Sequence, residues 1–236
     1  MAQKQVHIAE IGPVVLQKRK GARSIRLTVG HDGNLRISMP HWTPYAAAEA
    51  FAISKLAWIK AQQDGKTSRL FGPDERIGKS HRLRFTISTS HTVTTRVTPT
   101  ELIIRLPVGK TPMDKDVQSA VRASAVRALK QEAKKLLPGR LESMAARHGF
   151  DYRHVTIKHL KARWGSCSST KDIALNCFLM QLPWELIDYV ILHELVHTKI
   201  MAHGEKFWGE LAKYVNDLPA KRKAIRAHQP TLMTVD

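Results

Sequence analysis

The most informative stretch of this chain runs Ile187-Asp-Tyr-Val-Ile-Leu-His-Glu-Leu-Val-His-Thr-Lys-Ile-Met-Ala-His203. It contains the motif His-Glu-x-x-His at residues 193–197. Residues four apart share one face of a helix, so the imidazoles of His193 and His197 can reach a single metal ion. The carboxylate of Glu194 is then placed to accept a proton from water that the metal activates.

The residues around the motif predict a buried helix that begins at Pro183 and runs to about Met201. Its apolar positions are Leu186, Ile187, Val190, Ile191, Leu192, Leu195, Val196 and Ile200. Two imidazoles and a carboxylate on such a helix destabilise the fold unless their polar atoms find partners. A metal ion satisfies all three groups. The alternative is a pair of core histidines that hydrogen-bond to the backbone or to Glu194.

A catalytic zinc site needs a third protein ligand and leaves one coordination position open. His203 is the first candidate, because it follows His197 by six residues and precedes Gly204, which permits a tight exit from the helix. Glu205 and Glu210 on the following helix are alternative ligands. Three imidazoles suit zinc well, so we expect one Zn2+ per chain.

The rest of the sequence predicts an α+β protein with a boundary near residue 110, where Pro107, Gly109 and Pro112 interrupt the pattern. Residues 1–110 indicate a β-rich domain with one long helix. The pattern there predicts strands within 14–39 around a turn at 31–34, a helix from Thr43-Pro44 to about Gly65, and strands at 82–88, 92–97 and 102–106.

Residues 111–236 indicate a second, α+β domain. The pattern predicts helix over 114–148 with an interruption at Pro138-Gly139, and strands at 155–160 and near 173–176. A turn is expected at 164–168 between these strands. The helix that carries the motif follows, and a further helix covers 205–215, where Phe207 and Trp208 are expected to hold His203 by packing.

The charge of the chain is strongly positive, with 38 Lys and Arg against 20 Asp and Glu, a net charge of +18. Residues 184–217 differ, because they carry three lysines and six acids. A basic excess predicts attraction to polyanions, so non-specific contact with nucleic acid is a possible role of the surface. The densest basic cluster is Lys18, Arg19, Lys20 and Arg23, for which a solvated loop is the alternative interpretation.

The composition argues against secreted and membrane classes. No apolar run reaches the roughly 18 residues of a membrane-spanning helix, and the N-terminus has no apolar signal segment. Two cysteines, Cys167 and Cys177, are too few for a disulfide framework. We therefore expect a soluble cytoplasmic protein with reduced thiols and no membrane partner.

Several blocks of the sequence resemble the YgjP-like metallopeptidase family, which is related to the SprT-like and minigluzincin groups of zincins. The blocks are Trp164-Gly-Ser-Cys-Ser, Ile173-Ala-Leu-Asn176, Pro183, the segment 187–197, His203 and Phe207-Trp208. The N-terminal half is similar more loosely, so the resemblance covers most of the chain.

The resemblance implies that residues 111–236 form a zincin-like metallohydrolase domain with the motif helix against a small sheet. It implies zinc ligands His193, His197 and His203, with Glu194 as general base. It also implies that the strand ending near Asn176 lies beside the metal, where zincins commonly pair an extended peptide with a sheet edge.

The expected function is that of a zinc-dependent metallopeptidase acting on a peptide or protein. Arg163, Trp164 and Asn176 are the candidate substrate-binding residues, and Arg163 or Lys161 is also a candidate for stabilising an oxyanion or a phosphate. One alternative is a metal-dependent nucleotide pyrophosphatase of the UTP type, a role also attached to the family. The other is a nucleic-acid-binding protein whose metal is structural.

Overall fold

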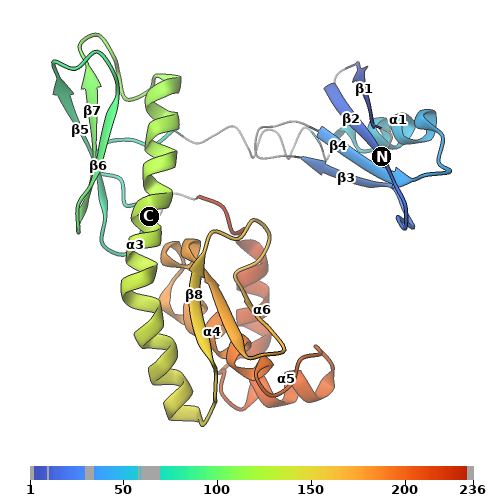
Figure 1. The fold of residues 1–236 in the computed structure, drawn as a ribbon, viewed down its shortest axis with the longest axis vertical. Helices are drawn as coiled ribbons and strands as arrows, with labels where there is room; N and C mark the ends of the chain where they lie inside the picture. The colour runs from blue at the N-terminus through green and yellow to red at the C-terminus, as the bar shows by residue number, and fades with distance from the viewer. Residues whose placement is uncertain (1–2, 10, 30–34, 58, 60–69, 233–236) are drawn as a thin grey trace. The chain divides into compact units, whose positions relative to one another are not determined.

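The structure is a computed structural model that describes residues 3–9, 11–29, 35–57, 59 and 70–232 (Figure 1). The chain divides into two compact units, residues 1–69 and 70–236. Helices and small sheets are mixed, so the chain has an α+β fold, as the sequence predicted. Among the described residues, no helix is long and apolar enough to cross a membrane.

The described part of the first unit contains a four-stranded sheet and a helix. Its strands are β1 (Gln3–Ile8), β2 (Gly12–Arg19), β3 (Arg26–Val29) and β4 (Leu35–Pro40), in the order β1-β2-β4-β3. β2 and β4 run parallel, and the other two pairs are antiparallel. The helix α1 (Tyr45–Ser54) adds its buried alanines, Ala48 and Ala52, to a core formed by alternate residues of β2 and β4. The expected turn at 31–34 and the expected end of the helix near Gly65 lie outside the described residues.

The second unit begins with a three-stranded sheet that packs on a long helix. The strands are β5 (Arg82–Ser88), β6 (Thr94–Val97) and β7 (Glu101–Pro107), in the order β5-β7-β6, and the helix is α3 (Lys115–His148). Buried residues of β7, such as Leu102 and Ile104, share one hydrophobic core with residues of α3, such as Val121 and Leu129. This sheet therefore belongs with the C-terminal unit, and the division of the chain falls at residues 69/70 rather than near residue 110.

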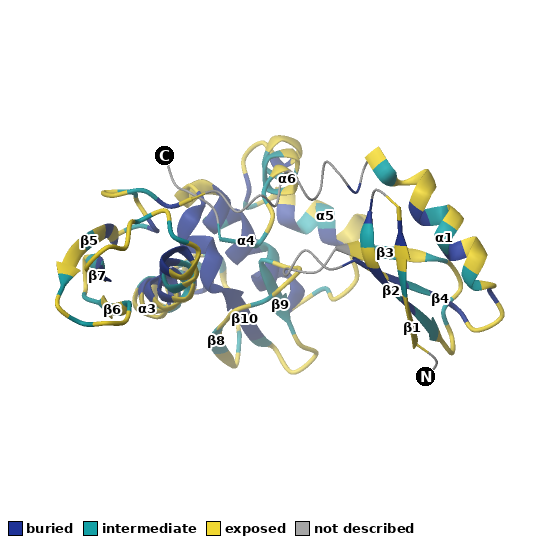
Figure 2. Cartoon of the chain, turned by 90° about the horizontal axis from the view of Figure 1, so that it is seen from above, coloured by how far each residue is buried: buried dark blue, intermediate teal, exposed yellow. Residues whose placement is uncertain are grey.

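The remainder of the second unit is a small sheet covered by helices (Figure 1). Its strands are β8 (His154–Lys158), β9 (Gly165–Cys167) and β10 (Asp172–Asn176), in the order β8-β10-β9. A 3-10 helix η1 (Cys177–Gln181) leads to α4 (Trp184–His197), α5 (Glu205–Ala212) and α6 (Leu218–Ala227). α4 packs against β9 and β10 and is buried along most of its length (Figure 2).

Two local predictions in this unit need correction. α3 continues through Pro138 without a break, because Leu137, Leu141 and Ala145 on both sides of it are buried in the same core. The segment expected to turn at 164–168 instead contains the short strand β9, which pairs antiparallel with β10. β9 is therefore the edge strand beside α4, and β10, which ends at Asn176, lies in the middle of the sheet.

A buried carboxylate on α3 connects this helix to the loop before the β5–β7 sheet. Glu132 of α3 accepts hydrogen bonds from the backbone N–H groups of Lys79, Ser80 and His81, and from the His81 ring at 2.5 Å. Burial alone would raise the pKa of Glu132, but these hydrogen bonds hold it below its ordinary value. The Lys79 ammonium donates to the carbonyl of Leu182, two residues before α4, at 2.6 Å. The loop at 79–81 thus links the β5–β7 sheet, α3 and the start of α4.

Candidate metal centre

Three histidine rings converge at the C-terminal end of α4. His193 and His197 lie four residues apart on one face of the helix, and their Nε2 atoms are 3.2 Å apart. After α4 ends, the chain turns and brings the Nε2 atom of His203 to 3.0 Å from each of the other two. Among the described residues, these three side chains are the cluster able to hold a metal ion.

The surroundings fix how the rings point. The Nδ1 atom of His197 lies 3.1 Å from the carbonyl oxygen of Ile200, and because a carbonyl only accepts, this Nδ1 carries the proton. Its Nε2 therefore presents a lone pair to the cluster. Phe207 is fully buried and packs its ring against all three imidazoles, at centroid distances of 4.5–4.9 Å. Trp208 stacks on His203 and donates its indole N–H to the His203 carbonyl, which confirms the packing expected for this pair.

The donor set fits a metal ion. A four-coordinate site with metal–nitrogen bonds of about 2.1 Å places neighbouring nitrogens about 3.4 Å apart, close to the separations here. Burial, followed by the neighbouring rings of His197 and His203, lowers the pKa of His193 to about 3. Burial also lowers the pKa of His197. The two imidazoles are therefore neutral near pH 7, which is the form that binds a metal.

The acidic alternatives to His203 stand outside this cluster. Glu210 is engaged elsewhere, because it pairs with Lys213 at 2.6 Å and accepts a hydrogen bond from the Tyr214 hydroxyl at 2.6 Å. Glu205, at the first turn of α5, is not part of the group of converging ligand atoms.

Glu194 is a buried carboxylate beside the cluster. Its side chain faces β9, it is 5% exposed, and its Oε2 atom has no hydrogen-bond partner among the described residues. Burial raises the pKa of Glu194 to about 8, and the positive charge of Arg163 partly opposes this rise. Gly165 makes room for the carboxyl group, because a Cβ atom there would lie 2.6 Å from its Oε1.

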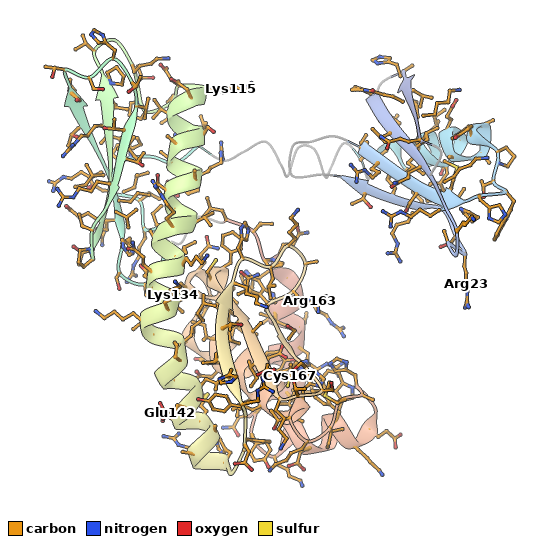
Figure 3. All side chains as sticks on the ribbon, in the orientation of Figure 1. Arg23, Lys115, Lys134, Glu142, Arg163 and Cys167 are labelled. Carbon is orange, nitrogen blue, oxygen red and sulfur yellow. The ribbon has the colours of Figure 1, made fainter. Side chains whose placement is uncertain are left out.

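The histidines and Glu194 open into a cavity of about 530 Å3. It is lined by Arg163, Trp164, Gly165, Ser166, Cys167, Tyr189, Val190, His193, Glu194, His197, Met201, His203 and Ile225. Two of the candidate substrate-binding residues, Arg163 and Trp164, are therefore at the cavity. Cys167 also lines it, and Figure 3 labels Arg163 and Cys167 on this part of the chain. Both cysteines are free, as expected, but only Cys177 is fully buried.

Asn176 does not reach the cavity, which corrects its assignment as a substrate-binding residue. Its side chain is completely buried and donates hydrogen bonds to the carbonyls of Leu160 and Arg163, at 2.7 and 2.9 Å. Its side-chain Oδ1 atom accepts a hydrogen bond from the backbone N–H of Phe178 and caps η1. Asn176 shapes the segment that leads into β9 and contacts no open space.

Seven residues that line the cavity were not among the predicted site residues: Gly165, Ser166, Cys167, Tyr189, Val190, Met201 and Ile225. Tyr189 had a usable signal, because it lies one helical turn before His193 on the same face of α4. Met201 and Ile225 had none, because the turn after α4 and the position of α6 depend on tertiary packing.

A histidine cluster with an adjacent buried carboxylate, opening into a cavity, is typical of metal-dependent hydrolases. The family model described as YgjP-like, metallopeptidase domain, matches residues 23–228. The chain therefore belongs to the YgjP-like metallopeptidase family, which confirms the resemblance seen in the sequence, and membership implies a bound metal.

Two proteins of Methanocaldococcus jannaschii are similar to parts of the chain. An uncharacterised protein is 42% identical over 65 residues, which are 26% of this chain and 59% of that protein. The chain thus spans less than two thirds of the length of this relative. The crystal structure of the metallopeptidase zymogen jannalysin is 29% identical, with a TM-score of 0.32, over 37% of this chain and 88% of that one.

Proposed function

We propose that the chain is a zinc-dependent metallopeptidase in which His193, His197 and His203 hold one zinc ion. The observation that carries the proposal is the convergence of three Nε2 atoms within 3.0–3.2 Å of one another in an open cavity. Three neutral imidazoles suit zinc better than the oxygen-preferring cations. The family of the chain supports peptide hydrolysis as the reaction.

A zinc ion held by these residues supplies a Lewis acid that polarises the scissile carbonyl and makes water more acidic. In this proposal Glu194 acts as the general base. Its carboxyl group lies next to the cluster and its Oε2 atom is unpartnered, so it is available to take a proton from the attacking water and pass it to the leaving amine. Burial raises the pKa of Glu194 to about 8, which brings its proton exchange close to neutral pH.

The edge strand β9 is the proposed docking position for the peptide backbone. Among the described residues β9 pairs with β10 alone, and its residues Gly165, Ser166 and Cys167 line the cavity. An extended peptide that adds to this edge passes over Glu194. Trp164 and Arg163, which precede β9, then border the bound chain.

The test is cleavage of casein and of quenched peptides by zinc-loaded protein, with nucleoside triphosphates assayed in parallel. Glu194→Gln is expected to keep its zinc and lose about 10²–10⁴-fold in kcat. His203→Ala is expected to lose zinc as well as turnover. Glu142→Gln, an exposed change on α3, is the matched control that keeps both. Consumption of nucleotide alone, abolished by Glu194→Gln, would overturn the peptidase assignment.

A further inference from the structure

Arginine side chains from two separate segments lie at or near the cavity. Arg163 lines it next to β9, and Ile225 brings α6 to another part of the wall. Arg222 and Arg226 lie four residues apart on α6, so they share one face of that helix, and Ile225 lies one turn after Arg222. α6, in the basic C-terminal segment of the sequence, therefore contributes to the cavity wall through Ile225.

Contacts place Arg222 close to the histidine cluster. Its guanidinium carbon lies 3.8 Å from the ring centroid of Trp208, and the other stacking partner of that ring is His203, at 5.6 Å. The charges of Arg222 and Arg226 also act on Tyr189, which lines the cavity, because they partly oppose the rise in its pKa that burial causes.

These positive charges are not held in ion pairs by acids of the described residues. Both acids of α4 outside the cavity are already paired, Asp188 with Arg140 and Glu185 with Lys221. Within the described part of the chain, no ion pair joins Arg163, Arg222 or Arg226 to an acid. The carboxylate that lines the cavity is Glu194, which is buried and on which the charge of Arg163 acts. The three guanidinium groups near the cavity thus have no ion-pair partner among the described residues.

We propose that Arg163, Arg222 and Arg226 form a cationic rim that selects peptides with an acidic side chain next to the scissile bond. The proposal rests on the proposed peptidase function and adds the substrate class. A guanidinium group binds a carboxylate through charge-assisted hydrogen bonds, and a cleft with apolar walls strengthens the field that attracts it. A lysine in the same substrate position meets like charge, so selection includes rejection.

The experiment compares quenched peptides that differ at one position. Cleavage sites in casein are first mapped by mass spectrometry, and a peptide around one site is made with Glu, Gln or Lys beside the scissile bond. Both termini are blocked, so that the side chain supplies the only carboxylate under test. At low salt we expect kcat/KM to fall by about fivefold from Glu to Gln and again from Gln to Lys. The preference should shrink at about 0.5 M NaCl, because salt screens the interaction.

Variants identify the source of the preference. Arg222→Gln/Arg226→Gln is expected to bring the Glu/Gln ratio close to one. Arg226→Gln alone, at an exposed position with no stacking contact among the described residues, should lower the ratio part of the way, as should Arg163→Gln. Lys134→Gln removes an exposed charge from α3, which does not line the cavity, and should leave the wild-type ratio unchanged. Arg226→Glu should improve the Lys peptide relative to the Glu peptide.

Three results would overturn the cationic rim while the peptidase function stands. They are cleavage without charge preference, a preference that survives in the arginine variants, and a preference seen only when the peptide has a free C-terminal carboxylate. Failure of zinc-loaded wild-type protein to cut any peptide would refute the proposed function, and the cationic rim with it.

Discussion

Replacing Gly165 by alanine should move the Glu194 carboxylate without touching the metal ligands. A Cβ atom at position 165 would lie 2.6 Å from Oε1, 2.8 Å from Cγ and 2.9 Å from Cδ of Glu194. Ordinary contacts of a Cβ atom begin near 3.4 Å, so each approach is 0.5–0.8 Å too short. Gly165 does not have a positive φ, so its backbone accepts alanine and the side chain of Glu194 must give way.

The size of the effect follows from the displacement. Relieving these contacts requires the carboxylate to move by roughly 0.5–1 Å, and a misplacement of that size costs about 10²-fold in turnover. This corresponds to about 2.7 kcal/mol of lost transition-state stabilisation. KM should change little, because the loss concerns proton transfer rather than peptide binding. Zinc content should stay at the wild-type level, because the histidines take no part in the clash.

The assay is kcat and KM on a quenched peptide, together with elemental analysis. Gly139→Ala is the matched control, because Gly139 lies on an exposed face of α3 with open space around it. That variant should keep full activity and gain about 0.5–1 kcal/mol of stability. Wild-type turnover in Gly165→Ala would refute the role given to the Glu194 position. Loss of zinc in Gly165→Ala would show that the change acts on the ligands instead.

Three further results are expected. In metal-free protein, the free energy of unfolding should fall by about 1–2 kcal/mol between pH 6.5 and 8. The reason is that Glu194 has a raised pKa in the folded state, so the folded protein holds a proton that the unfolded protein has already lost, and it gives up this proton as the pH rises through this range. Urea denaturation should show Glu194→Gln free of this decline, and an equal decline in both proteins would contradict the assignment. Glu132→Ala should cost about 3 kcal/mol or more in the same measurement, because it leaves His81 and three backbone amides without their partner; a loss below 1 kcal/mol would show that water replaces the carboxylate. Chelation should lower the Tm of wild-type protein and leave that of His197→Ala unchanged, as expected when an ion binds only the folded state.

Much of the candidate site could be predicted from local sequence. The spacing of His193 and His197 places both rings on one helical face wherever the helix lies. His203 was identified from its distance along the chain and from Gly204, and the structure brings its ring to the other two. The apolar character of α4 likewise indicated burial, which is what shifts the pKa values of His193 and Glu194.

The parts that could not be predicted depend on partners distant in sequence. β9 consists of small residues with weak β-propensity, and pairing with β10 makes it a strand. α3 continues through Pro138 because residues on both sides of the proline are buried in the same core. The β5–β7 sheet belongs to the C-terminal unit because the two share one core and because Glu132 of α3 binds the loop before β5. These contacts cannot be inferred from the change in composition near residue 110. Tertiary packing alone brings α6 to the cavity, so the sequence identified its arginines only as part of a basic C-terminal segment.

Anomalous diffraction at the zinc absorption edge, from crystals of zinc-loaded wild-type protein, would locate the ion that the three histidines are proposed to hold. We expect one anomalous peak per chain, about 2.1 Å from the Nε2 atoms of His193, His197 and His203, with Glu194 near the ion but not bound to it. A peak ligated by Glu205, Glu210 or Cys167 in place of His203, or no peak at this cluster, would contradict this expectation.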